Sequence, residues 1–514
     1  MSVGGARSES PITTIQDVRG IRLEIEHFAG YGAKIRGVEF LAHVLAKHWI
    51  VTYLTGMALL GLLHLAIGAD GTVVGLAFLI VCVSVVPAAL FGARDVPALT
   101  SIAFGVSYAS FAILWKLLTF EPLDIGLYSP VHSHVVALVG VSGVSLAALL
   151  SHFVWRRGPL LDERYTQDGL DFFFIIACLL LVFGIVMALA GGQANGGIRA
   201  LAAKALVLFP IVMFCRNLAK GEQPLSRGVV LTVCLMPMLA LATNSRQGVL
   251  IPIVAIAAVL FAFRIKVSWK VISVVAIVGV LFIGALSPAI KAVRGARTFM
   301  SADQVFSATI ARITTPEGRA QMDSVRTLMS VANGPFVLKY VKGGEEIGRF
   351  VGIQPLDIFA DKVDRFGPIG TGRFWQSVSE QLPAFIVPDK TVVNSPSYAF
   401  WVYGLIPWGN EHNETNTPFG DAYSFGGLRF MFFCTLTVFF LYCLMFRVFC
   451  PRLENSPLAT FLFASTIYMA LMGYIVPTLG TIFREFPFWI ALFALVTTIR
   501  RPIIGLVSQP LRRF

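Results

Sequence analysis

The long polar part of this chain ends in Trp408-Gly-Asn-Glu-His-Asn-Glu-Thr-Asn-Thr-Pro-Phe-Gly-Asp-Ala-Tyr423, which leads through Phe425-Gly-Gly427 into an apolar run. Residues 410–416 bring together two Glu, one His and three Asn side chains. Such a density of hydrogen-bonding groups where a loop enters a membrane indicates a site of chemistry, because polar groups are costly there. Asn, Thr, Pro and Gly also suit a turn and a helix cap, and for Thr417-Pro-Phe-Gly420 that simpler interpretation is an equal alternative.

The composition predicts a membrane protein. Of 514 residues, 56% are hydrophobic and only 14% are charged, and the mean hydropathy is +0.75. These values lie far outside the range of soluble globular proteins. We therefore expect an all-α polytopic protein with about twelve transmembrane helices. The expected spans are 49–68, 72–92, 96–119, 134–155, 170–190, 198–218, 227–243, 247–264, 269–288, 427–447, 457–477 and 485–500.

The distribution of Lys and Arg predicts the orientation. Residues 289–426 carry 13 basic and 13 acidic residues, so the remaining 28 basic against 16 acidic residues lie elsewhere in the chain. Alternate connections between the expected spans are basic, which is typical of cytoplasmic loops. Their basic residues are Arg94, Arg156, Arg157, Arg164, Arg216, Lys220, Arg227, Arg264, Lys266, Lys270, Arg447 and Arg452. The net charge of +12 is thus explained by topology, and no nucleic-acid partner is expected.

The same alternation divides the chain into five parts. We expect a cytoplasmic tail at 1–48, spans one to nine at 49–288, a large periplasmic loop at 289–426, spans ten to twelve at 427–500 and a cytoplasmic tail at 501–514. The loop is expected to be mostly helical. Residues 305–331 are predicted to form an amphipathic helix that is interrupted at Pro316, and 374–382 and 398–405 carry aromatic residues at helical or interfacial spacing.

Basic residues at the outer ends of spans run against the orientation rule and need another explanation. A guanidinium group binds two phosphate oxygens at once, so an anion held at the membrane surface is one explanation. The alternative is that these side chains pair with Asp or Glu residues of the large loop or reach into the interface, and we favour it for Lys116 and Arg484. For Arg246, which lies in a tight turn, we favour the interpretation that its side chain binds an anionic ligand. The other candidates are Arg199, Lys204, Lys291, Arg294 and Arg297.

His412 is the best acid–base candidate, with Glu411 and Glu414 beside it. A neutral imidazole there can take a proton from a hydroxyl group. The remaining histidines, His132 among them, are expected to be interfacial. The spacing of His412 and the two Glu residues is irregular for a metal site, so no metal is predicted.

Several of these stretches resemble one family. The segments are 384–390 (Ala-Phe-Ile-Val-Pro-Asp-Lys), 413–417 (Asn-Glu-Thr-Asn-Thr), 419–423 (Phe-Gly-Asp-Ala-Tyr) and 425–427 (Phe-Gly-Gly). Together they resemble the end of the large periplasmic loop in bacterial O-antigen and exopolysaccharide repeat-unit polymerases of the Wzy type. Residues 244–248 (Asn-Ser-Arg-Gln-Gly) are similar to a helix start in these polymerases and in O-antigen ligases. Two departures are Thr391, where Pro is usual, and Arg429, where an apolar residue is usual.

The resemblance implies a metal-independent glycosyltransferase of the GT-C kind in the bacterial inner membrane, with its active site facing the periplasm and no cofactor. Donor and acceptor would be glycans linked to undecaprenyl pyrophosphate, and a chain-length regulator would be a further protein partner. Arg246 with Arg199, Arg294 and Arg297 would bind the leaving pyrophosphate, and His412, or else Glu411 or Glu414, would deprotonate the acceptor hydroxyl. The expected substrate-binding residues also include Asn413, Asn416, Asp421, Tyr423, Lys390 and Arg484. An O-antigen ligase and a transporter or flippase of lipid-linked sugars remain alternatives.

Overall fold

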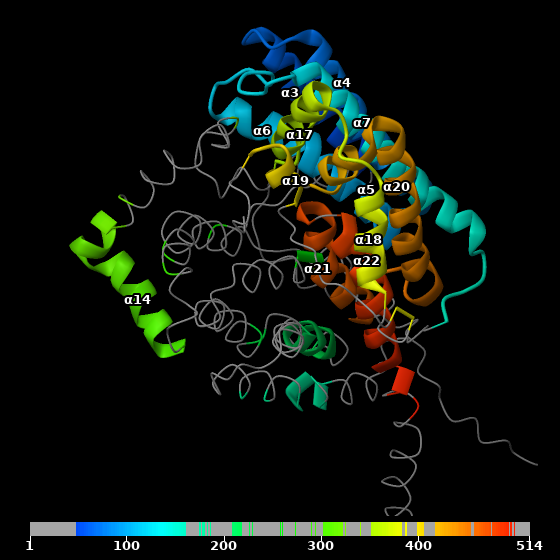
Figure 1. Cartoon of the computed structure of the whole chain (residues 1–514). Coiled ribbons are helices and arrows are strands. Elements are labelled where there is room, and N and C mark those ends of the chain that lie inside the picture. Colours follow the sequence, from blue (N-terminus) through cyan, green and yellow to red (C-terminus); the bar gives the residue numbers. More distant parts are fainter. Residues whose placement is uncertain are drawn as a thin grey trace, which may run out of the picture. The chain divides into compact units, whose positions relative to one another are not determined.

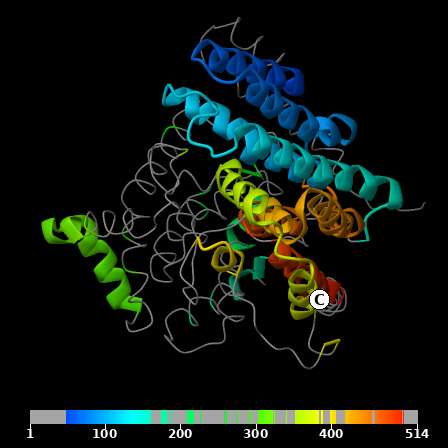
Figure 2. The ribbon, with the colours of Figure 1, turned by 45° about the horizontal axis from the view of Figure 1, so that its top comes forward.

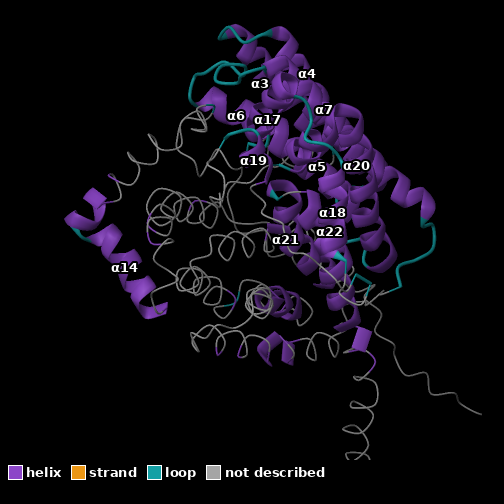
Figure 3. Ribbon diagram, in the orientation of Figure 1, coloured by secondary structure: helices purple, strands orange, loops and turns teal. Residues whose placement is uncertain are grey.

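The computed structural model describes residues 48–160, 302–321, 351–382, 398–405, 417–453, 457–473 and 475–492, a segment at 208–217, and scattered single positions. The chain divides into two compact units, Met1–Thr52 and Tyr53–Phe514, and nearly all described residues belong to the second. Every regular element among the described residues is a helix (Figures 1 and 3). The all-α prediction is therefore confirmed for this part of the chain.

Five helices are long and apolar enough to cross a membrane. They comprise α3 (Trp49–Ala66), α4 (Gly71–Phe91), a continuous run Val96–Leu118, α7 (Pro130–Val154) and α20 (Pro418–Phe449). The run Val96–Leu118 consists of α5 (Val96–Gly105), the π-helix η2 (Val106–Ser110) and α6 (Phe111–Leu118). These helices correspond to the expected spans one to four and ten. The full count of twelve stays a prediction, because most of the other spans lie outside the described residues.

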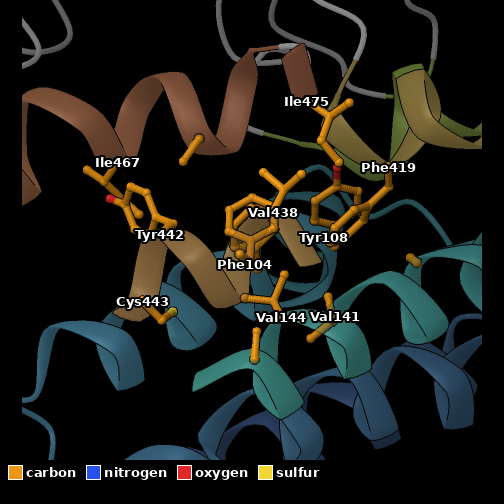
Figure 4. Packing of buried hydrophobic residues seen from close by; sticks show 14 of the residues in the cluster. Phe104, Tyr108, Val141, Val144, Phe419, Val438, Tyr442, Cys443, Ile467 and Ile475 are labelled. Atoms are coloured by element: carbon orange, nitrogen blue, oxygen red, sulfur yellow. The ribbon is translucent and has the colours of Figure 1, made fainter. Parts of the chain in front are cut away.

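Small residues allow the spans to pack closely. α4 and α7 run side by side (Figure 2). A Cβ atom added to Gly105 would collide with the Ser84 hydroxyl oxygen. The hydroxyls of Ser101 and Ser145 are 2.7 Å apart. Small and hydroxyl-bearing residues at such contacts are typical of membrane helix pairs, since lipid supplies no hydrophobic drive between helices. Aromatic and aliphatic side chains fill the core between α5, α7 and α20 (Figure 4).

Among the described residues, three of the predicted basic connections meet at one end of the spans, which we call the basic end. Asp95, before α5, forms an ion pair of 2.6 Å with Arg447 near the end of α20. The Leu160 amide donates to the Val448 carbonyl at 2.7 Å, and the Leu453 amide donates to the Arg94 carbonyl at 3.2 Å. The connections that follow α4, α7 and α20 are thus joined, as expected if the charge pattern places them on one side.

The connections between α3 and α4 and between α6 and α7 meet at the other end, which we call the opposite end. The Asp70 amide donates to the Asp124 carboxylate at 3.3 Å. The hydroxyl of Tyr340, from the large insertion, donates to the Leu123 carbonyl at 2.7 Å. The insertion is therefore joined to the spans at the end away from the basic connections.

α20 starts earlier than the sequence predicts and is broken. The expected span begins at 427, whereas the helix begins at Pro418, and Gly426 and Gly427 inside it have non-helical backbone angles. The side chain of Thr417 accepts a hydrogen bond from the Gly420 amide at 3.3 Å, so the capping interpretation of this stretch is confirmed. We call Pro418–Phe425 the short arm.

The break folds the short arm back along the rest of α20. The Phe104 ring contacts both Phe419, at 5.2 Å between centroids, and Phe439, at 4.9 Å. Nearer the break, the Phe374 ring lies 5.9 Å from Phe425 and 5.2 Å from Phe430. A straight helix would carry residues 20 positions apart about 30 Å from each other. The two arms therefore lie side by side and antiparallel, with the glycine pair at the turn.

The insertion contributes further helices. They are α14 (Ala302–Thr314), α17 (Ile353–Phe366), α18 (Gly372–Gln381) and α19 (Tyr398–Val402), and α21 (Pro457–Met472), α22 (Ile475–Gly480) and η6 (Thr481–Glu485) follow α20. The interruption at Pro316 is as predicted, and of the two alternatives for 374–382 and 398–405 the structure shows helices, α18 and α19. α17 packs along the spans: the Gly352 amide donates to the Ser107 carbonyl of η2 at 2.9 Å.

Candidate functional site

Three aspartates of α17 follow one another at helical spacing. Asp357, Asp361 and Asp364 stand at i, i+4 and i+7, so they share one face of the helix. Asp361 pairs with Arg365 on the same helix at 2.7 Å. The other two carboxylates reach across to α7 and α20, and they define the candidate site.

Asp357 anchors α17 to the start of α7. Its carboxylate accepts hydrogen bonds from the Tyr128 amide at 2.6 Å, from the Ser129 amide at 2.9 Å and from the Ser133 hydroxyl. Burial raises the pKa of this carboxyl, and the three hydrogen bonds act in the opposite direction. Three donors around one buried carboxylate fix the position of α17 against the opposite end of α7.

Asp364 lies two turns further on and meets a histidine and a tyrosine. The Tyr423 hydroxyl donates to Asp364 Oδ1 at 3.1 Å. His132 Nε2 lies 3.1 Å from the Tyr423 oxygen and 3.4 Å from Asp364 Oδ2. We call His132, Asp364 and Tyr423 the His–Asp–Tyr cluster, and its members come from the first turn of α7, from α17 and from the short arm.

The cluster is open on one side. The side chains of His132 and Asp364 are 37% and 45% exposed, whereas Tyr423 is buried. A small molecule can therefore reach the imidazole and the carboxylate, while the tyrosine supports them from within. Such a group can take up and release a proton, which is the chemistry expected of a histidine oriented by a carboxylate.

The backbone around the cluster is held by the break in α20. Two carbonyls lose their helical partners at the break and accept hydrogen bonds from the loop after α17. The Ser424 carbonyl accepts from the Ile369 amide at 2.8 Å, and the Phe425 carbonyl accepts from the Gly370 amide at 3.0 Å. The Tyr403 hydroxyl donates to the Gly367 carbonyl at 3.1 Å, and burial raises the pKa of this phenol to about 12. The loop after α17 is thus tied to the short arm, so Asp364 and Tyr423 are held together by backbone contacts as well.

Of the thirteen predicted site residues, the structure describes three. Tyr423 belongs to the cluster. Asp421 is buried, and its carboxylate accepts from the Ile475 amide at 3.2 Å, where α22 begins. Arg484, in η6, donates to the Glu380 carbonyl at 2.6 Å and to the Leu382 carbonyl at 3.4 Å. Asp421 and Arg484 thus contact the backbone of neighbouring elements and do not meet the cluster through these bonds.

The other predicted site residues lie outside the described residues. These are Arg199, Arg246, Arg294, Arg297, Lys390, Glu411, His412, Asn413, Glu414 and Asn416. Lys116, for which pairing is expected, is buried, and its ammonium group lies 3.2 Å from the Glu121 carboxylate and 4.3 Å from the centre of the Tyr340 ring. Lys116 therefore pairs with an acidic residue, but this residue lies in the connection after α6 and not in the large loop.

His132, Asp357 and Asp364 were not among the site residues predicted from the sequence. The spacing of the three aspartates on α17 was a readable signal, because it places carboxylates in a stripe on an amphipathic helix. His132 gave no comparable signal, since a histidine at the start of a span is also typical of an interfacial residue. In the described part of the chain, no three His, Cys, Asp or Glu side chains are placed to hold a metal ion.

Comparison with known proteins gives no match to a family model, a curated protein or a solved structure.

Proposed function

We propose that this chain is an integral-membrane glycosyltransferase that polymerises oligosaccharide repeat units carried on undecaprenyl pyrophosphate. The observation that carries the proposal is the partly exposed His–Asp–Tyr cluster at the opposite end of the spans. An acid–base group at the end of a membrane bundle suits a substrate whose lipid stays in the bilayer while its polar head reacts at the surface.

The sequence motifs support the same function. Tyr423 belongs both to the cluster and to the segment 419–423, which resembles the end of the periplasmic loop in repeat-unit polymerases. By that resemblance, the loop would bring polar groups to a lipid-linked glycan. The short arm delivers Tyr423 to the first turn of α7 in a comparable way.

The proposed orientation is supported by the distribution of charge. Connections rich in Lys and Arg are typical of the cytoplasmic side, and the basic end carries Arg94, Arg447 and Arg452. The cluster would then face the periplasm of a bacterium, with the protein in the inner membrane. By this proposal, lipid-linked units that have been moved across the membrane are polymerised on its periplasmic side.

The proposed reaction needs a stabilised leaving group and an activated acceptor. Arg246, Arg199, Arg294 and Arg297 are proposed to bind the pyrophosphate that leaves the growing glycan. A general base is proposed to take the proton of the acceptor hydroxyl, and the sequence offers His412, Glu411 and Glu414 for this task. Asn413, Asn416, Asp421, Lys390 and Arg484 stay proposed substrate-binding residues.

Glycan analysis of a deletion strain of the source bacterium tests the proposal. The strain is complemented with wild type, Arg246→Ala or His412→Ala, with membrane protein levels matched. A polymerase leaves surface glycan of one repeat unit in the deletion strain, and wild type restores long chains. Loss of all surface repeats with long lipid-linked chains would indicate a ligase instead. Short units retained on the cytoplasmic side would indicate a flippase.

A further inference from the structure

We infer that His132 is the base that accepts the proton of the acceptor hydroxyl, with Asp364 and Tyr423 as positioning residues. This inference rests on the proposed function and deepens it, because it names a proton acceptor that no sequence motif marks. It follows from the hydrogen-bonding partners of the imidazole, from its exposure and from the way in which three helices hold it.

The partners of Nε2 fix the tautomer of the His132 ring. The Tyr423 hydroxyl donates to Asp364, so its oxygen accepts from His132, and the second atom near Nε2 is the carboxylate oxygen Oδ2 of Asp364. Both atoms facing Nε2 are therefore acceptors, and the proton of a neutral ring lies on Nε2. The lone pair is then on Nδ1, the nitrogen on the other side of the ring.

Nδ1 is the atom that can act as the base. Within the described part of the chain, no hydrogen bond to this nitrogen is found, and the side chain is 37% exposed. A histidine oriented through one nitrogen by a carboxylate, with the other nitrogen open to substrate, is the arrangement that general-base catalysis requires. The carboxylate also stabilises the imidazolium that forms when Nδ1 takes up a proton.

The proposed step balances as a substitution. The acceptor oxygen forms a bond to the anomeric carbon of the donor sugar, and the bond from that carbon to the pyrophosphate oxygen breaks. The pyrophosphate leaves with the electron pair of that bond. The hydroxyl proton moves to Nδ1 of His132, and the imidazolium then passes it to water.

The surrounding contacts make the cluster rigid. Asp357 fixes α17 to the start of α7 through three hydrogen bonds, and it lies on the same helix as Asp364. The Ile369 and Gly370 amides tie the loop after α17 to the short arm, which carries Tyr423. Each member of the cluster is thus held by its own helix and by a second contact, as a site that must keep its geometry requires.

The test uses the full-length protein in nanodiscs and, as substrate, lipid-linked repeat units extracted from the deletion strain. We expect His132→Ala to lower the polymerisation rate by about 100-fold or more, the size typical of a lost general base. Added imidazole should restore part of the rate of His132→Ala, because it can occupy the vacated space and take the proton. Asp364→Asn should lower kcat more than it raises KM, Asp364→Glu should recover part of the loss, and Tyr423→Phe should have a smaller effect.

Matched controls separate chemistry from folding. Asp361→Asn changes a carboxylate one turn away on α17, and His152→Gln changes a histidine at the other end of α7; both should stay within about twofold of wild type. Thermal unfolding and gel filtration of each variant check the fold, and His132→Gln provides a second test if His132→Ala is poorly folded.

The outcomes distinguish the inference from the function. Wild type that makes no polymer from these units would overturn the proposed function itself. If wild type polymerises the units and both His132 variants are fully active, only the assignment of the base is overturned. The assignment is also overturned if the His132 variants lose activity that imidazole cannot restore and their thermal stability is lowered as well. If His412→Ala lowers the polymerisation rate and His132→Ala does not, the base is His412.

Discussion

At the scale of single residues, the structure depends on buried carboxylates whose partners are backbone amides. Asp357 accepts from two amides and one hydroxyl, and Asp421 accepts from the amide that opens α22. Such bonds hold segments that are far apart in the sequence, and a buried acceptor that loses its donors is costly.

Asp357→Asn should therefore lower the free energy of unfolding by about 1–3 kcal/mol. The asparagine amide can accept with one oxygen only, and its NH2 group would face the Tyr128 or Ser129 amide, which is also a donor. Thermal unfolding of the detergent-purified protein measures the effect.

The control for this change is Asp70→Asn. Asp70 is exposed and caps α4 by accepting from the Thr72 amide at 2.7 Å, and asparagine caps a helix about as well as aspartate. The two variants should differ clearly in unfolding midpoint. Equal midpoints would show that the three bonds to Asp357 contribute little.

At the scale of elements, the break in α20 decides where Tyr423 lies. Gly427 has φ 70° and ψ −165°, a region that is essentially restricted to glycine. Without this turn the short arm would continue the line of the span, and Tyr423 would be carried away from His132. The glycine pair is thus a requirement of the cluster as well as of the helix.

Gly427→Ala should destabilise the protein by about 1–3 kcal/mol through backbone strain, although no atom lies within 4 Å of the added methyl group. Gly75→Ala is the matched control, because Gly75 lies within α4, also has open space around it and carries no positive φ. There alanine should be neutral or stabilising, by up to about 1 kcal/mol. The comparison of the two unfolding midpoints tests the role of the turn.

At the scale of the whole molecule, contacts between distant parts of the sequence join the connections at each end. The Asp95–Arg447 pair links residues 352 positions apart, and both side chains are buried. Removing one partner of a buried pair leaves the other charge uncompensated.

Arg447→Met should accordingly lower the free energy of unfolding by about 3–5 kcal/mol. The double variant Asp95→Asn with Arg447→Met should recover a substantial part of that loss, because no isolated charge is left. Thermal unfolding of the two single variants and the double variant gives the coupling free energy. Additive effects would contradict a direct interaction between the two side chains.

The proposed orientation in the inner membrane gives a separate prediction. Phe120, between α6 and α7, is 84% exposed, and Gly158 lies in the connection after α7. In intact cells with a permeable outer membrane, Phe120→Cys should react with a membrane-impermeant maleimide and Gly158→Cys should react only after the inner membrane is opened. The six described native cysteines are buried or half-buried and should label slowly. The reverse pattern would invert the proposed topology.

Much of the fold was readable from local sequence. The long apolar runs predicted the four N-terminal spans within a few residues, because length and hydropathy suffice for a helix that crosses lipid. The alternation of Arg and Lys also grouped the connections at 92–95, 155–160 and 450–453, which the structure joins. The motif ending in Tyr423 marked one member of the cluster.

Only the tertiary structure decided which side chains that tyrosine contacts. Residues 132, 364 and 423 are far apart in the sequence and follow no period, because they lie on three separate helices that bring their side chains together. The reversal at Gly427 was equally hidden, because a Gly-Gly pair before an apolar run reads as the end of a loop as readily as a turn between two helical arms. Hydropathy is a local property and predicts the spans, and the distribution of charge predicts their orientation. The cluster depends instead on packing between segments that local sequence does not encode.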